Sequence, residues 1–174
     1  EENFANLMTR RAAELGFDKM TFKNAWGKYD PEQKVTVRQL ALLAEHIIRT
    51  YPEYYPIFGE KDFTWNKIRQ QNRNPILGTV EGADGMKTGF ICASGFNLVA
   101  SATRNGRRLI AVVLGAPSSA ARALIASSGS SKSAQRGAAS IPAVGLKARV
   151  SRSQPDIGDC ARRISSALIP RKAS

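Results

Sequence analysis

A lysine, a threonine and a glycine stand side by side at Lys87-Thr88-Gly89, directly after Asp84-Gly85-Met86. The lysine is a compact cation with three N–H donors, and the threonine adds a hydroxyl donor beside it. Glycine has no Cβ, so another backbone can approach closely at this point. Together these residue types suit the binding of an anionic group, such as a carboxylate, against an exposed strand.

The chain does not contain the residue patterns that would supply an activated nucleophile. No serine stands three residues before a lysine, and none stands two residues before an asparagine. His46 is the only histidine, and its helical phase predicts a position on the solvent side. Cys92 therefore has no predicted histidine partner. A disulfide between Cys92 and Cys160, and two unrelated thiols, both stay open.

Three sequential strands are predicted around the Lys-Thr-Gly segment, over residues 86–91, 95–104 and 107–115. Asn105-Gly106 separates the second from the third, and both positions tolerate the positive φ of a two-residue hairpin turn. The strands therefore form an antiparallel meander. A smaller hairpin is expected from residues 63–65 and 68–70, joined by Asn66-Lys67.

Helices are predicted before and after this strand region in the sequence. Apolar residues recur at helical spacing over about residues 3–15, and Gly16 ends that helix. A second helix follows Thr36, which fits an N-cap of a capping box with Gln39, and it ends before Pro52. A short helical turn near residues 54–58 and a short helix over about 118–126 complete an α+β arrangement.

Composition divides the chain in two. Up to Arg122 there are 17 Lys and Arg against 12 Asp and Glu, whereas the last 52 residues hold 9 against 2, with 11 Ser, 10 Ala and no aromatic residue. Such a segment buries too little apolar surface to offset chain entropy. We therefore expect a folded domain over residues 1–126 and a mostly disordered basic tail over 127–174. Because the charge lies in this tail and not on a patterned face, specific nucleic-acid binding is not expected.

Many short matches in order and spacing show a family resemblance, and Lys-Thr-Gly is only one of them. The chain resembles the low-molecular-weight penicillin-binding proteins that are serine-type D-alanyl-D-alanine carboxypeptidases. The matches cover about residues 2–122 and comprise Glu2-Asn3-Phe4 with Leu7-Met8 and Ala12, Leu15-Gly16, Thr21-Phe22-x-Asn24, Thr36 to Ala44, Asn72-Arg73-Asn74-Pro75, Asp84-Gly85-x-Lys87-Thr88-Gly89, Gly95 to Ala102, and Arg108 to Gly115.

The resemblance implies a role for five residues in binding substrate. Lys87 and Thr88 would hold the free carboxylate of a peptide ending in D-Ala-D-Ala, and Gly89 would let that peptide approach the strand. The backbone N–H of Phe90 would supply one oxyanion-hole donor. Arg122 would help to bind the terminal carboxylate, although a plain helix-surface arginine remains an alternative.

The resemblance also implies what this chain lacks. In the family, the Ser-x-x-Lys and Ser-x-Asn segments precede the part that resembles Glu1–Leu15. The chain is therefore expected to be the later part of a β-lactamase/transpeptidase-like domain, with no catalytic residue of its own and with the nucleophile and base upstream. The predicted function is a fragment of a carboxypeptidase that trims D-alanine from peptidoglycan stem peptides through an acyl-serine. A non-catalytic cell-wall or membrane-surface binding protein is the alternative.

Neither a cofactor nor a metal ion is expected. The implied partners are peptidoglycan stem peptides ending in D-Ala-D-Ala, with β-lactams binding the complete enzyme. A periplasmic or other extracytoplasmic location follows from the resemblance. In the tail, the residues Ile157, Cys160, Ala161, Ile164 and Leu168 fall on one helical face. This pattern is one option for peripheral contact with an anionic membrane surface, and a disordered end is the other.

Overall fold

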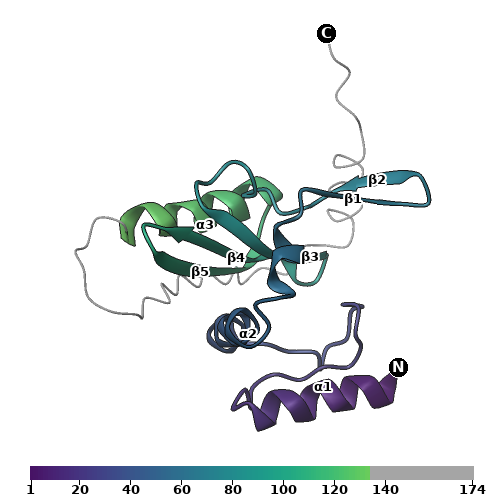
Figure 1. Ribbon diagram of the computed structural model, residues 1–174. Helices are drawn as coiled ribbons and strands as arrows, with labels where there is room; N and C mark the ends of the chain where they lie inside the picture. Colours follow the sequence, from purple (N-terminus) through teal and green to yellow (C-terminus); the bar gives the residue numbers. More distant parts are fainter. Residues whose placement is uncertain (134–174) are drawn as a thin grey trace.

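A three-stranded antiparallel sheet is the centre of the fold. The computed structural model describes residues 1–133 (Figure 1), with side chains described to Ser128. The strands β3 (Ala83–Ile91), β4 (Gly95–Arg104) and β5 (Arg107–Ala116) are paired in the order β3-β4-β5. The predicted meander is confirmed. At its second turn Asn105 has φ 51° and Gly106 has φ 69°, as a two-residue hairpin requires.

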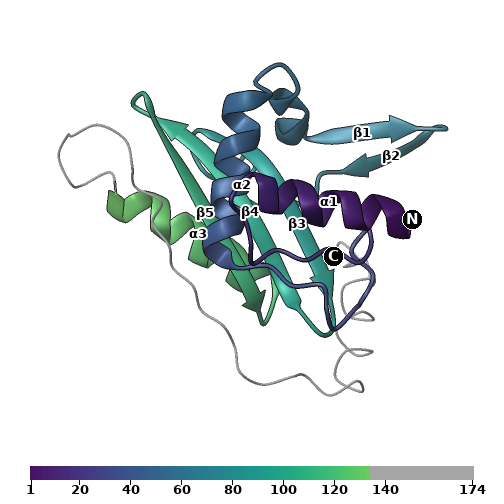
Figure 2. The same ribbon diagram turned by 90° about the horizontal axis from the view of Figure 1, so that it is seen from below.

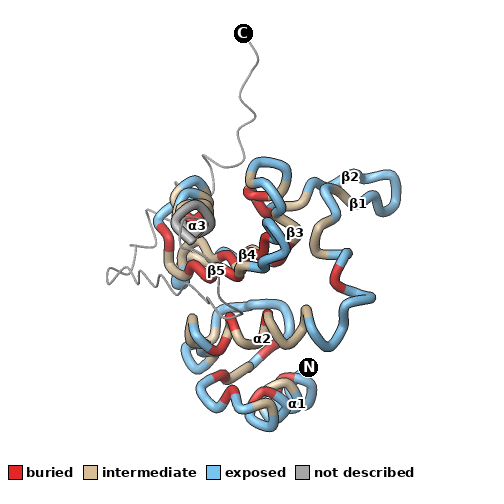
Figure 3. The backbone as a smooth tube through the Cα atoms, turned by 60° about the vertical axis from the view of Figure 1, so that its left-hand side comes forward, coloured by how far each residue is buried: buried red, intermediate tan, exposed pale blue. Residues whose placement is uncertain are grey.

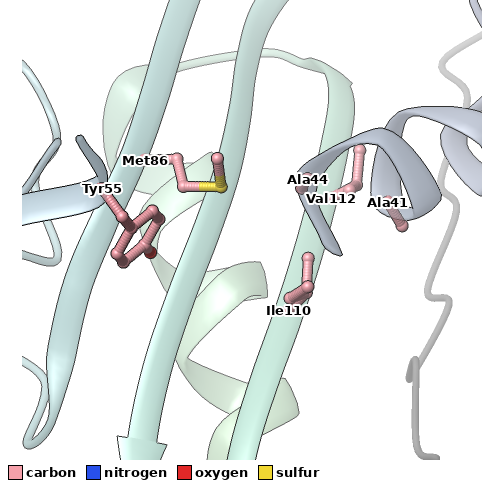
Figure 4. Packing of buried hydrophobic residues seen from close by; sticks show 6 residues of the cluster. All are labelled: Ala41, Ala44, Tyr55, Met86, Ile110 and Val112. Carbon is pink, nitrogen blue, oxygen red and sulfur yellow. The ribbon is translucent and has the colours of Figure 1, made fainter. Parts of the chain in front are cut away.

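One helix covers each face of the sheet. Helix α2 (Val37–Thr50) packs on one face and helix α3 (Ser119–Ser133) on the other, as Figure 1 shows. On the α2 face, small alanines of the helix meet larger side chains of the strands and of the segment before them (Figure 4). This cluster consists of Ala41, Ala44, Tyr55, Met86, Ile110 and Val112.

A second cluster lies between the sheet and α3. Its buried members are Ile76, Leu98, Ala100, Val113, Ala116 and Ala126. Figure 3 shows the buried residues concentrated along the strands and on the helix surfaces that face them. The sheet is therefore the middle layer of a helix–sheet–helix arrangement, which fixes the position of β3.

Helix α1 (Glu2–Glu14) lies beyond α2, on the side away from the sheet (Figure 1). Ala12, Phe17 and Met20 are buried there against leucines of α2. Gly16 ends the helix with φ 83°, a left-handed conformation that the predicted glycine stop requires.

Half of the predicted capping box forms at the start of α2. The Thr36 hydroxyl accepts a hydrogen bond from the Gln39 N–H at 3.2 Å, so the predicted N-cap is confirmed. The second bond of the box, between the Gln39 side chain and the Thr36 N–H, is replaced by bonds to residues outside the helix. The Gln39 side chain donates to the Asp18 carboxylate at 2.6 Å and accepts from the Lys19 N–H at 2.9 Å. The buried Gln39 thus ties α2 to the segment that follows α1.

The segment between α2 and the sheet contains the predicted short helical turn and hairpin. The turn is the 3-10 helix η1 (Tyr55–Gly59), and the hairpin is formed by β1 (Asp62–Trp65) and β2 (Ile68–Gln71). Asn66 and Lys67 both have positive φ at its tip. The hairpin projects from the body of the molecule, as Figure 2 shows most clearly.

Helix α3 is longer than predicted. We expected a helix over about 118–126 followed by disorder, but the helix continues to Ser133. The Ser/Ala composition weakens burial without stopping a helix, and no proline occurs between Pro117 and Pro142. The remainder of the predicted tail, including the amphipathic pattern over 157–168, lies outside the described residues. Within the described part of the chain no helix is long and apolar enough to cross a membrane.

Gly82, just before β3, should be the least tolerant glycine of the fold. Its φ is 75°, and a Cβ there would lie 2.0 Å from the Thr103 carbonyl oxygen. We expect Gly82→Ala to lower the free energy of unfolding by at least about 3 kcal/mol. Gly106→Ala is the matched control, because Gly106 has a similar φ with open space around it, and should cost about 1 kcal/mol. Equal losses in urea unfolding would contradict this assignment.

Candidate functional site

The Lys-Thr-Gly segment lies in the second half of β3, where the strand emerges from the core. Met86 is buried, whereas Lys87 and Gly89 are exposed and Thr88 is half-buried. Successive side chains of a strand point to opposite faces of the sheet. Met86 is buried on the face that packs against α2, so Lys87 lies on the opposite face. In the described part of the chain β3 pairs only with β4, which leaves its other edge open.

All five residues predicted to bind substrate line one groove of about 690 Å³. These residues are Lys87, Thr88, Gly89, Phe90 and Arg122. Four of them come from β3, whereas Arg122 belongs to α3 and is brought there by the packing of that helix on β4 and β5. The rest of the lining comes from the end of β3, the start of β4 and the turn between them, from Arg73 and from the loop between α1 and α2.

The loop between α1 and α2 forms the opposite wall of this groove. Its lining residues are Phe22, Trp26, Gly27, Lys28, Asp30, Gln33 and Val35. In the sequence this stretch reads only as polar and turn-rich, so its place at the site was missed. The Asn24, Gly27 and Asp30-Pro31 turn signals indicate an ordered loop, but they do not say what it faces.

Side-chain hydrogen bonds hold that wall in shape. The buried Asn24 accepts from the N–H groups of Gly27 and Lys28, at 2.8 and 2.9 Å, and donates to the Lys28 carbonyl at 3.0 Å. Gln33 accepts from the N–H groups of Lys23 and Asn24. A loop with its backbone bonded in this way presents a defined surface to the groove.

Arg122 is buried, with only 5% of its surface exposed. Its guanidinium donates to the Asn97 carbonyl at 3.1 Å, to the Arg73 carbonyl at 3.3 Å and to the Ser119 hydroxyl at 3.3 Å. The alternative of a helix-surface arginine is therefore wrong. Burial lowers the pKa of Arg122, and its Nε has no hydrogen-bond partner among the described residues.

Two aromatic rings lie beside this arginine. Phe90 and Phe96, opposite each other on β3 and β4, stack with their ring centroids 4.2 Å apart. The Arg122 guanidinium carbon lies 5.5 Å from the centre of the Phe96 ring. A positive charge on an apolar, aromatic surface interacts more strongly with an anion than the same charge in open water, because the local dielectric is lower.

A polar network anchors the start of β3. Tyr55 donates to the Asp84 carboxylate at 3.0 Å, and Arg108 pairs with the same carboxylate at 2.8 Å. Arg108 also donates to the buried Ser101 hydroxyl at 2.6 Å and lies over the Tyr55 ring. Lys87 follows Asp84 by three residues on the same strand. The network therefore fixes the position of Lys87 at the groove.

The Tyr55 hydroxyl gives the network a pH dependence. Burial raises the pKa of Tyr55 to about 12, from an ordinary value of 10.0. The neutral form is the one that the fold accommodates, so the stabilisation is complete below pH 10 and is lost as pH rises toward 12. The free energy of unfolding should fall by about 2 kcal/mol across this window. Chemical unfolding at several pH values should show a smaller decline for Tyr55→Phe, and equal declines would contradict the assignment.

The fold is that of penicillin-binding carboxypeptidases. The sequence profile described as "D-alanyl-D-alanine carboxypeptidase", of the peptidase S11 group, matches residues 1–118. The chain therefore belongs to the D-alanyl-D-alanine carboxypeptidase family. One curated relative is D-alanyl-D-alanine carboxypeptidase DacC of Escherichia coli, which is 49% identical over 117 residues. That match takes in 67% of this chain and 29% of DacC.

Solved structures of the family share the fold. Penicillin-binding protein 5 of Haemophilus influenzae is 40% identical and superposes with a TM-score of 0.63, over 71% of this chain and 36% of that one. Penicillin-binding protein D2 of Listeria monocytogenes, in a cefotaxime-bound form, is 31% identical with a TM-score of 0.62, over 69% and 50%. The chain thus spans about 30% of the curated relatives that it matches.

Cys92, at the β3–β4 turn, is disulfide-bonded, so the alternative of an unpaired thiol, which the sequence left open, is wrong for this residue. Cys160, with which a pairing was considered, lies outside the described residues. Within residues 1–133 no group of His, Cys, Asp and Glu side chains is arranged to hold a metal ion.

Proposed function

We propose that the protein to which this chain belongs is a serine-type D-alanyl-D-alanine carboxypeptidase, and that this chain supplies the carboxylate-binding wall of its active site. The observation that carries the proposal is the convergence of Lys87, Thr88, Gly89, Phe90 and Arg122 on one groove. The alternative of a non-catalytic binding protein is not favoured, because the curated relatives that match are named as carboxypeptidases.

In this proposal the groove binds a peptidoglycan stem peptide that ends in D-Ala-D-Ala. Lys87 and Arg122 provide positive charge for the terminal carboxylate, and Thr88 donates a hydroxyl hydrogen bond to it. The open edge of β3 receives the peptide backbone at Gly89, where no Cβ obstructs it. The Phe90 N–H then donates to the oxygen that becomes negative when the carbonyl is attacked.

The reaction proposed for the whole protein has two steps. A serine hydroxyl attacks the carbonyl of the penultimate D-alanine, an acyl-serine forms, and the terminal D-alanine leaves. Water then attacks the acyl-serine and releases the shortened peptide. The 174-residue chain contains neither Ser-x-x-Lys nor Ser-x-Asn, so it has no group placed to perform the first step. We therefore propose that these residues come from another part of the protein.

We also propose that the protein acts outside the cytoplasm, where peptidoglycan is trimmed, and that it binds β-lactams when complete. The disulfide at Cys92 supports an oxidising compartment. A β-lactam mimics the peptide terminus and traps the serine as a stable acyl adduct. Penicillin-binding protein D2 of Listeria monocytogenes, whose cefotaxime-bound structure is known, is a relative with the same fold.

Covalent labelling tests this function. The chain alone should gain no mass on incubation with benzylpenicillin. A hybrid protein, defined here as the part of Escherichia coli DacC that precedes the matched segment fused to this chain, should gain the mass of one penicillin. Circular dichroism of both proteins checks that each is folded. A penicillin adduct on the isolated chain, or a folded hybrid that remains unlabelled, would contradict the proposal.

A further inference from the structure

The hairpin of β1 and β2 has one apolar and one polar face. In its register Phe63 lies opposite Gln70, and Trp65 lies opposite Ile68. Residues directly opposite each other in an antiparallel pair share a face, so Phe63, Trp65 and Ile68 lie together. All three are exposed to solvent, at 67%, 75% and 61% of their surface.

The other face of the hairpin is polar. It holds Thr64 opposite Arg69 and Asp62 opposite Gln71. Arg69 forms an ion pair with Asp62 across this face. The hairpin is therefore an amphipathic ribbon, with its charged pair turned away from the apolar side chains.

This ribbon stands away from the core. β1 and β2 pack chiefly against each other, and the hairpin projects from the body in both Figure 1 and Figure 2. None of its eight strand residues is buried. A two-stranded ribbon gains little stability alone, and a contiguous exposed apolar surface marks a place of interaction.

The size and charge of this surface favour a lipid bilayer over a protein partner. Three side chains of this kind present roughly 400–500 Å², against about 800 Å² per partner in a stable protein interface. A bilayer surface needs no matching shape, and it accepts tryptophan at the level of the lipid headgroups. Lys67 at the tip and Lys61 at the base form no ion pair within the described residues.

We propose that the hairpin of β1 and β2 binds the surface of a bilayer that contains anionic phospholipids. The apolar side chains Phe63, Trp65 and Ile68 enter the headgroup region, and Lys61 and Lys67 contact lipid phosphates. This surface is separate from the groove and does not depend on the proposed function. The hairpin and the basic tail beyond Ser133 are different segments of the sequence, so membrane binding by either one can be tested by itself.

The two tryptophans of the chain make the test specific. In the complete chain, Trp26→Phe leaves Trp65 on the hairpin as the single reporter, and Trp65→Phe leaves Trp26 in the groove wall. Vesicles of equal parts phosphatidylcholine and phosphatidylglycerol should shift the Trp65 emission to the blue and reduce its quenching by iodide severalfold. Pure phosphatidylcholine vesicles should do much less, and added salt should weaken the effect. Trp26 should change little in either case.

Matched variants separate the hairpin from other parts of the chain. In the Trp26→Phe background, Phe63→Ser with Ile68→Ser should abolish the Trp65 shift. Phe4→Ser with Leu124→Ser removes two exposed apolar side chains elsewhere and should preserve it. Circular dichroism confirms that each variant is folded. Co-sedimentation with anionic vesicles while Trp65 stays unshifted would assign binding to the tail and overturn the proposal. An equal shift at Trp26 would also overturn it.

Discussion

Lys87→Ala should lower the rate of acylation by benzylpenicillin in the hybrid protein by about 10²–10³-fold, the size typical of removing one charge-stabilising donor from an acyl-transfer site. The cause is electrostatic, because Lys87 is the exposed cation of β3 at the groove and contributes no packing to the core. Stopped reactions analysed by mass spectrometry give the rate. The melting temperature should stay close to that of the unmodified hybrid.

Lys19→Ala is the control for a general effect of charge. Lys19 is exposed and lies outside the groove, so its loss should change acylation by less than about twofold. Lys87→Arg retains the charge with a different geometry and should recover only part of the rate. Near-normal acylation of the Lys87→Ala hybrid would show that another group binds the carboxylate.

Arg122→Ala should produce the largest combined loss of stability and binding. The guanidinium joins three parts of the structure, namely α3, the Asn97 carbonyl of β4 and the Arg73 carbonyl before β3. Its removal leaves two carbonyl groups without these donors, and should lower the free energy of unfolding by about 3 kcal/mol. Urea unfolding of the chain measures this change.

The same substitution should raise the KM of the hybrid for a D-Ala-D-Ala peptide more than it lowers kcat. Arg122→Lys keeps a positive charge, but it cannot reach both carbonyls with a planar fork. It should retain more substrate binding than Arg122→Ala while losing much of the stability. An Arg122→Ala protein as stable as the parent, with an unchanged KM, would exclude both roles.

The local elements could be predicted because their signals are local. Asn105-Gly106 determines the second turn of the meander, Gly16 ends α1, and Thr36 caps α2. Each depends on a few neighbouring residues whose backbone conformation or hydrogen bonding leaves little choice. The Lys-Thr-Gly segment was also evident, because a run of chemically specialised residues within a strand is visible in one sequence.

The features that were missed depend on contacts between distant residues. Helical phase alone did not show that Arg122 is buried, since its partners at Asn97 and Arg73 are far away in the sequence. The second wall of the groove comes from a loop about 50 to 60 residues before β3, and nothing local says which strand it faces. The Gln39 side chain likewise does not form its predicted capping bond, because Asp18 offers it a charged acceptor.

We propose that this groove recognises the free carboxylate of a D-Ala-D-Ala peptide. The most direct measurement compares D-alanine release by the hybrid protein from such a peptide and release of D-alaninamide from the same peptide with its carboxylate converted to an amide. We expect a strong preference for the free acid in kcat/KM, retained in Lys19→Ala and largely lost in Lys87→Ala. Equal turnover of the two peptides, or a preference that Lys87→Ala leaves intact, would contradict it.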